Sequence, residues 1–192
     1  ATRVKEIIVD KLGVDICITS SQKALALPPG IAICSMSQKA VERAKTVPFR
    51  GLYFDLLSLY DYIQKKDYQY PSTPSLSHMF ALNYQLDKML AEGLDNRYKR
   101  HADMAEYVRG WARENFEVFT KEGYLSNTLT VIKNTNGISV GDLNKELVTR
   151  AYSISNGYGK LKENTFRIAH MAERTMDELK ELIKEIEDIL KL

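Results

Sequence analysis

Two short apolar runs near the start of the chain predict a pair of buried strands. The first is rich in β-branched residues and covers about residues 15–20, and the second covers residues 31–36. Short polar side chains at residues 20–22 end the first run, and Pro-Pro-Gly at residues 28–30 forces a turn between the two. The loop between the strands therefore carries Lys23 just past a strand end, where α/β sheets place their chemistry.

Helical periodicity dominates the middle of the chain. The expected helices cover residues 37–45, part of residues 49–68, residues 73–92 and residues 95–115. Ser37 suits the N-cap of the first helix because its hydroxyl can accept a hydrogen bond from a backbone amide. The strongest break in the chain, residues 69–74, places Thr73 as the cap of the third helix and Pro74 at its first position. Gly93 ends that helix.

Strands and helices alternate after residue 115. Strands are expected at residues 117–119, 127–132, 152–155 and 165–171, with a turn at residues 156–159. A helix begins at Ser139 or Asp142. Thr175 and Glu178 have capping-box spacing and open the last helix, which has one continuous apolar face. This alternation favours an α+β domain with a mainly antiparallel sheet.

Composition is that of an ordinary folded protein. Of the 192 residues, 44% are hydrophobic and 27% are charged, and the net charge is only +2. We therefore expect neither nucleic acid nor a membrane surface as a partner. No apolar stretch reaches transmembrane length and no signal peptide opens the sequence, so the expected location is the cytoplasm.

Metal chemistry finds no support in the sequence. Cys17 and Cys34 each lie within an apolar run and are expected to be buried free thiols. His78, His101 and His170 share no ligand spacing, so structural or surface roles are expected for them.

Two basic side chains carry candidate chemistry. The amine of Lys23 can condense with an aldehyde to form a Schiff base, the bond on which pyridoxal phosphate enzymes are built. Arg167 lies in an apolar run, where a charge needs a reason, and its planar guanidinium can bind a carboxylate through two parallel hydrogen bonds. The alternative for Arg167 is a strand-edge arginine paired with Glu163 or Glu173.

Several motifs in a fixed order support the first interpretation. They are S-Q-K-A-L at 21–25 with P-P-G at 28–30, Y-P-S-T-P at 70–74, E-G-L at 92–94 with Arg97 and Arg100-His101, G-Y-G-K-L-K at 157–162 and F-R-I-A-H-M at 166–171. Together they resemble the class V, fold-type I, pyridoxal phosphate-dependent aminotransferases, in the branch of serine–pyruvate and alanine–glyoxylate aminotransferase. The resemblance covers nearly the whole chain.

The resemblance implies roles for individual residues. Lys23 would be the catalytic residue that holds the cofactor as a Schiff base and then transfers a proton. Gln22 would approach the cofactor beside it. Tyr70 and Thr73 would reach the cofactor phosphate of the neighbouring subunit, which implies a homodimer with shared active sites. Arg167 would bind the carboxylate of a small amino acid, alanine or serine, or of a 2-oxo acid, glyoxylate or pyruvate.

The implied fold class is α/β and α+β, the C-terminal half of a fold-type I enzyme. Residues 1–92 would form the end of the large cofactor-binding domain, and residues 93–192 the small α+β domain. The cofactor also needs a carboxylate at its ring nitrogen, a stacking aromatic and backbone amides for its phosphate. In the family these precede the lysine by more than 22 residues, so we expect this chain alone to lack transaminase activity.

The sequence departs from the family pattern at Ser20, Asn156 and Ala169, where glycine is common. Asn156 puts the substrate specificity in doubt. One alternative function is a lyase or cysteine desulfurase of the same fold, which the apparent burial of the cysteines disfavours. The other is a catalytically incomplete structural or dimerisation module.

Overall fold

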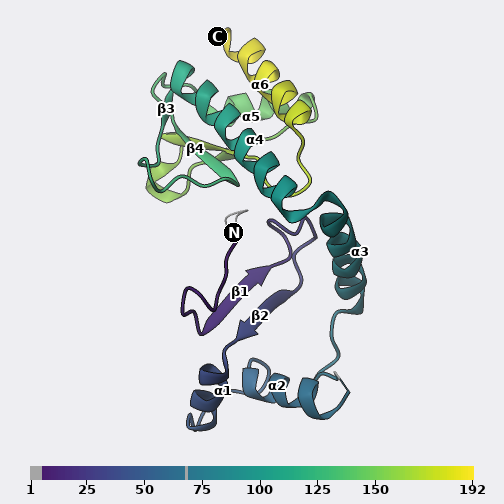
Figure 1. Cartoon of the computed structure of the whole chain (residues 1–192). Coiled ribbons are helices and arrows are strands. Elements are labelled where there is room, and N and C mark those ends of the chain that lie inside the picture. Colours follow the sequence, from purple (N-terminus) through teal and green to yellow (C-terminus); the bar gives the residue numbers. More distant parts are fainter. Residues whose placement is uncertain (1–5, 68) are drawn as a thin grey trace. The chain divides into compact units, whose positions relative to one another are not determined.

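A computed structural model of the protein describes residues 6–67 and 69–192. The chain divides into two compact units, which are described separately (Figure 1). The N-terminal unit comprises residues 7–86, and the C-terminal unit is made chiefly of residues 87–192. Assignment of residues 1–92 to a large domain and of residues 93–192 to a small one stays a prediction.

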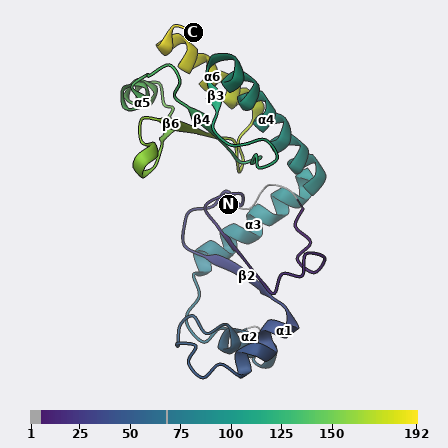
Figure 2. The ribbon, with the colours of Figure 1, turned by 90° about the vertical axis from the view of Figure 1, so that its left-hand side faces the viewer.

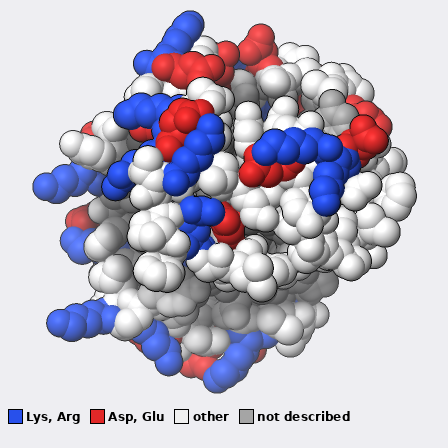
Figure 3. Space-filling model, turned by 90° about the horizontal axis from the view of Figure 1, so that it is seen from below, with Lys and Arg blue, Asp and Glu red and all other residues white. Residues whose placement is uncertain are grey.

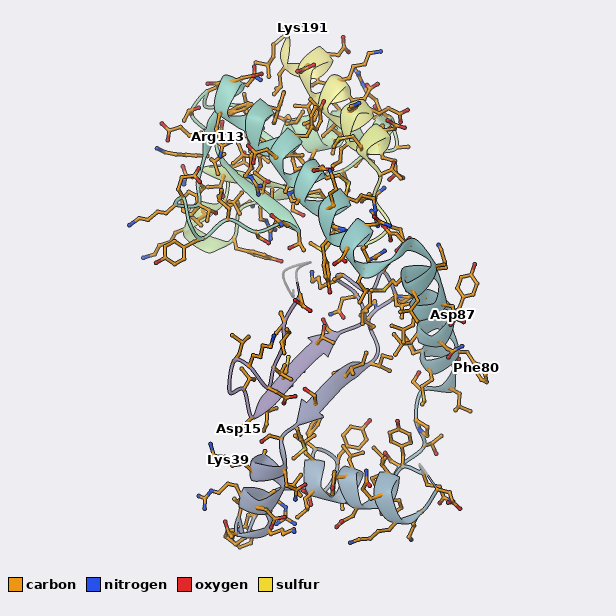
Figure 4. The ribbon with its side chains drawn as sticks, viewed as in Figure 1. Asp15, Lys39, Phe80, Asp87, Arg113 and Lys191 are labelled. Carbon is orange, nitrogen blue, oxygen red and sulfur yellow. The ribbon has the colours of Figure 1, made fainter. Side chains whose placement is uncertain are left out.

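The N-terminal unit contains the two expected strands. They are β1 (Ile16–Ser20) and β2 (Ala32–Met36), which pair antiparallel with Ile18 opposite Cys34. Helices α1 (Gln38–Lys45) and α2 (Leu56–Lys65) follow. The Ser37 hydroxyl accepts a hydrogen bond from the Ala40 amide at 3.1 Å, which confirms the predicted cap. Lys39 on α1 reaches back to Asp15 at 3.0 Å (Figure 4).

The prediction that these strands and their cysteines are buried is wrong. Ile18 is 63% exposed, Cys34 is exposed and Cys17 is half-buried. The physical reason is that β1 and β2 form a sheet of two strands within the described residues, and two strands are too few to cover their own faces.

Helix α3 (Leu76–Glu92) begins two residues later than predicted, at Leu76 rather than at Pro74. Ser75 precedes its first turn, with its carbonyl accepting from the Met79 amide at 3.1 Å. Thr73 and Pro74 therefore lie outside the helix, and Thr73 does not cap it. The apolar stripe of α3 is also largely exposed: Phe80 is 75% exposed and projects away from the helix (Figure 4).

The C-terminal unit is built on a four-stranded antiparallel sheet in the order β3-β4-β6-β5. Its elements are α4 (Leu94–Asn115), β3 (Glu117–Val118), β4 (Leu129–Lys133), α5 (Val140–Thr149), β5 (Ser155–Asn156), the 3-10 turn Gly159–Leu161, β6 (Thr165–Ala169) and α6 (Met176–Leu190). Helix α4 contacts β3, β4 and α6, and α5 contacts α6 and β5 (Figure 2). The helices thus bury one face of the sheet in a continuous apolar core.

Local signals placed most of these elements correctly. Ser139 caps α5, so it rather than Asp142 opens the helix. The capping box of Thr175 and Glu178 is present at the start of α6. The strand expected at residues 152–155 is instead confined to β5, because the Ile154 amide donates to the Asn144 side chain rather than to a neighbouring strand.

Membrane insertion gains no support from the helices of residues 6–67 and 69–192. None of them combines the length and the apolar composition that crossing a bilayer requires.

Candidate functional site

The loop that carries Lys23 is closed by one buried side chain. Ser21 is fully buried, and its hydroxyl donates to the Pro28 carbonyl at 2.7 Å. Its backbone amide donates to Ile31 at 3.2 Å, and its carbonyl accepts from the Leu27 amide at 3.0 Å. Three hydrogen bonds of a single residue therefore fix both ends of the loop directly after β1.

Lys23 itself lies at the start of a tight turn, because its carbonyl accepts from the Ala26 amide at 3.0 Å. Ala26 adopts a positive φ of 58°, which completes the turn. The side chains of Lys23 and its neighbour Gln22 are both exposed. Within the part of the chain that the structure describes, the Lys23 amine has no ion-pair or hydrogen-bond partner, so it is available to a ligand.

Helix α3 supports the same loop from outside. The His78 ring contacts the Pro29 carbonyl at 3.2 Å through Nε2 and the Ser75 hydroxyl at 2.8 Å through Nδ1. A Cβ atom added to Gly30 would lie 2.3 Å from that ring, so a larger residue at position 30 would force the His78 ring to move. Sequence reasoning missed Ser21, His78 and Gly30 as positioning residues, although Pro-Pro-Gly was the available signal for a close approach.

Tyr70 and Thr73 lie together on the exposed segment between α2 and α3. This segment, with Leu76 and Met79, lines a shallow cavity of about 650 Å³. Neither hydroxyl has a hydrogen-bond partner among the described residues. Because Ser75 and not Thr73 precedes α3, capping does not compete for the Thr73 hydroxyl.

Arg167 belongs to the other unit and sits in β6, an inner strand of the sheet. It is opposite Val131 on β4 and Ser155 on β5. It lines a cavity of about 410 Å³ next to α6, together with Arg174, the acidic Glu178 and apolar residues that include Val148 of α5 and Leu179 of α6. Lys23, Gln22, Tyr70 and Thr73 all lie in the N-terminal unit, and no hydrogen bond described links any two of their side chains.

The alternative explanation of Arg167 as a paired strand-edge residue is wrong. The Glu163 carboxylate accepts from the Val140 amide and from Asn156, and Glu173 accepts from Arg97 at 2.9 Å. Arg167 instead donates from Nε to the Asn156 carbonyl at 3.0 Å. Its two terminal amines have no hydrogen-bond or ion-pair partner in the described chain, so both are open to a ligand.

The E-G-L…R…R-H motif forms a charged network at the junction of α3 and α4. Glu92 accepts from Arg97 at 2.7 Å and from Arg100 at 2.6 Å, and these arginines hold the pKa of its carboxyl below the usual range, Arg100 most. Arg97 is almost fully buried and also donates to the Ala172 carbonyl at 3.2 Å. The motif thus ties the helix junction to the segment that follows β6.

Two histidines are buried in the C-terminal unit. His170 lies between the Thr130 hydroxyl at 2.9 Å and the Asn127 carbonyl at 3.1 Å, and burial lowers its pKa to about 4. His101 contacts the Arg97 carbonyl at 2.7 Å through Nδ1, and burial lowers its pKa as well. A cluster of three or more potential metal ligands does not occur in residues 6–67 or 69–192.

Charge is mixed on the face shown in Figure 3, where basic and acidic side chains are interspersed. Opposite charges also lie side by side in the C-terminal unit, where Lys145 pairs with Asp142 and Lys133 with Glu117, each at 2.7 Å.

Comparison with known proteins gives a consistent result. The family model "Aminotransferase class-V" matches residues 2–182. The chain is 41% identical over 167 residues to an uncharacterized aminotransferase of Methanocaldococcus jannaschii, covering 85% of this chain and 43% of the relative. It is 34% identical over 192 residues to serine–glyoxylate aminotransferase of Arabidopsis thaliana, covering 95% of this chain and 46% of the relative.

Solved structures agree on the fold. The structure of alanine–glyoxylate aminotransferase from Nostoc sp. superposes with a TM-score of 0.87 at 24% identity, covering 96% of this chain and 50% of that one. The described chain therefore has the architecture of the C-terminal part of a fold-type I enzyme, as the sequence predicts. It spans about half the length of the curated relatives it matches.

Proposed function

Because the chain belongs to the class-V aminotransferase family, a family of pyridoxal phosphate-dependent enzymes, we propose that it is part of an aminotransferase. The proposed enzyme moves an amino group between a small amino acid, alanine or serine, and a 2-oxo acid, glyoxylate or pyruvate. Both kinds of substrate carry a carboxylate, and one anion-binding group can therefore position the amino acid and the 2-oxo acid alike.

The open fork of Arg167 is the observation that carries this proposal. Its Nε is already bonded to the Asn156 carbonyl, while both terminal amines are free of partners among the described residues. Parallel donation from two such amines suits a carboxylate in geometry as well as charge. Arg167 would thus bind and orient the substrate.

The residues of the N-terminal unit fit the cofactor chemistry. Pyridoxal phosphate, when bound, supplies an aldehyde for covalent attachment and a ring that withdraws electrons from the substrate. The unpaired Lys23 amine would attach to it and later move a proton at the substrate α-carbon. Gln22 would lie beside it, and the unpartnered hydroxyls of Tyr70 and Thr73 would donate to phosphate oxygens.

We further propose a cytoplasmic homodimer in which Tyr70 and Thr73 serve the site of the neighbouring subunit. Sedimentation equilibrium checks this, with an expected mass of twice 21.9 kDa for the purified chain. A monomeric mass at micromolar protein concentrations would contradict the proposed homodimer.

Reductive trapping tests the role of Lys23. The chain is incubated with pyridoxal phosphate, treated with borohydride and digested, and the modified lysine is located by mass spectrometry. We expect the label on Lys23 and its loss in Lys23→Ala, whereas Lys11→Ala, which removes another exposed lysine of the same unit, leaves it unchanged. Label spread evenly over the surface lysines would contradict the proposal.

Burial does not disfavour a cysteine desulfurase, because Cys34 is exposed and Cys17 is only half-buried. The position and the pKa of Cys34 disfavour it instead. Cys34 lies within strand β2 rather than on a mobile loop, and its thiol contacts the Ser35 carbonyl. Partial desolvation and the neighbouring Cys17 raise the pKa of Cys34, which lowers the fraction of reactive thiolate. A reactive cysteine is therefore not supported.

A further inference from the structure

The guanidinium of Arg167 is held on two sides by one short turn. From one side Nε donates to the Asn156 carbonyl at 3.0 Å. From another the ring of Tyr158 lies under the guanidinium, with 4.3 Å between the Arg167 Cζ atom and the ring centroid. Both contacts leave the terminal amines untouched.

The side chain of Asn156 is turned inward. Its Oδ1 accepts from the Gly157 amide and from the Glu163 amide, each at 2.8 Å, and its Nδ2 donates to the Glu163 carboxylate. All of its hydrogen bonds therefore close its own turn. The departure from glycine at position 156 is explained by this closure, and it fixes the carbonyl that holds Arg167.

The turn is anchored to the rest of the C-terminal unit. The Glu163 carboxylate accepts from the Val140 amide at 2.8 Å at the start of α5, and the Glu163 carbonyl accepts from the Asn134 side chain at 2.7 Å. Gly157 has no room for a side chain, since a Cβ atom would lie 2.1 Å from the Leu161 carbonyl oxygen. The backbone at Tyr158 is therefore anchored, although the residue is 77% exposed.

We propose that Tyr158 and Asn156 are positioning residues of the carboxylate site, an inference that rests on the proposed role of Arg167. Tyr158 holds the plane of the guanidinium through a cation–π contact, and Asn156 sets its rotation through Nε. Because the orientation is fixed before binding, less conformational entropy is lost when a carboxylate engages the two terminal amines. At an exposed site the ring contact changes affinity about two- to fivefold.

NMR of the ¹⁵N-labelled full chain tests the inference, with pyruvate as the probe and uncharged methyl pyruvate as its control. The Arg167 Nε–Hε signal is identified by its loss in Arg167→Lys. We expect Tyr158→Leu to weaken pyruvate binding about two- to fivefold and to remove the ring-current shift of Hε. Tyr158→Phe keeps both, and Tyr124→Leu, at a tyrosine that is 74% exposed, changes neither.

A second variant separates positioning from general stability. Asn156→Gly removes the three side-chain hydrogen bonds of the turn, and we expect faster exchange of the Arg167 Hε with water. Unchanged exchange would refute the role of Asn156, and unchanged affinity and Hε shift in Tyr158→Leu would refute that of Tyr158. If pyruvate does not bind the parent chain, the carboxylate role of Arg167 fails, while the Hε shift and exchange still decide whether the two residues hold the guanidinium.

Discussion

The two units hold their candidate residues in different ways. Arg167 lies on an inner strand whose neighbouring residues, Phe166 and Ile168, are buried in the core of the C-terminal unit. Lys23 lies on a loop fixed by hydrogen bonds of Ser21, in a unit whose buried apolar side chains, among those described, are Val41 and Leu57. The C-terminal unit therefore holds its candidate residue by the packing of its own core, whereas the N-terminal unit holds Lys23 by polar contacts at one loop.

Core truncation should show the largest difference between the units. Phe166→Ala removes a fully buried ring and is expected to lower the free energy of unfolding by about 3–5 kcal/mol. Phe80→Ala, in the N-terminal unit, removes a ring that is mostly in solvent and should change it by less than about 0.5 kcal/mol. Urea unfolding followed by circular dichroism measures both losses, and equal losses would show that the two units do not differ in their packing.

Acid should destabilise the C-terminal unit through His170. Its pKa is about 4 in the folded chain against 6.5 when exposed, so the unfolded chain binds the proton first. Stability from the neutral ring is complete above pH 6.5 and is lost as the pH falls toward 4, by about 3 kcal/mol. Trp111, which lies in this unit, reports its unfolding by fluorescence. A His170→Gln variant with an equally steep loss over this range would contradict the prediction.

The ion pairs of Glu92 should contribute less to the free energy of unfolding than the apolar core does, but more than a surface ion pair does. Glu92→Gln leaves the buried Arg97 with weaker compensation, although Arg97 keeps its ion pair with Glu173, and should lower the free energy of unfolding by about 1–3 kcal/mol. Because the arginines lower the pKa of Glu92, this contribution is lost as the pH falls through its folded-state pKa. Asp103→Asn, which breaks an exposed pair with Lys99, serves as the control at about 0–1 kcal/mol in urea unfolding.

The smallest expected effect concerns the Lys23 loop. Ser21→Ala removes the hydrogen bond to the Pro28 carbonyl and should lower the free energy of unfolding by only about 1 kcal/mol. Local order should suffer more, with faster hydrogen exchange at the Leu27 amide and slower trapping of pyridoxal phosphate at Lys23. Ser77→Ala, at an exposed serine of α3, is the matched control. Exchange no faster than in that control would show that the loop does not depend on Ser21.

Signals that act over three or four residues were read correctly from the sequence. Ser37 and the Thr175–Glu178 capping box are examples, because a cap is decided by the residues of one helical turn. The prediction that Thr73 caps α3 is wrong because Ser75, which is equally able to cap, directly precedes the helix. The motifs sufficed for the family because their order along the chain is itself a long-range observation.

Long-range contacts could not be read in this way. The exposure of Cys34 depends on how many strands join the sheet, which no local pattern contains. The choice between a paired and an open Arg167 depended on where the carboxylates of Glu163 and Glu173 find their partners. The roles of Lys23, Gln22, Tyr70, Thr73 and Arg167 stay predictions.

The contact between His78 and Gly30 has a consequence for sequence variation. An imidazole that leaves no space for a methyl group makes two positions, far apart along the chain, depend on one another. Among homologues, a side chain larger than hydrogen at position 30 should go with a smaller residue at position 78 or with a displaced ring there. Substitutions in the lysine loop at position 30 and in helix α3 at position 78 would then be correlated among homologues.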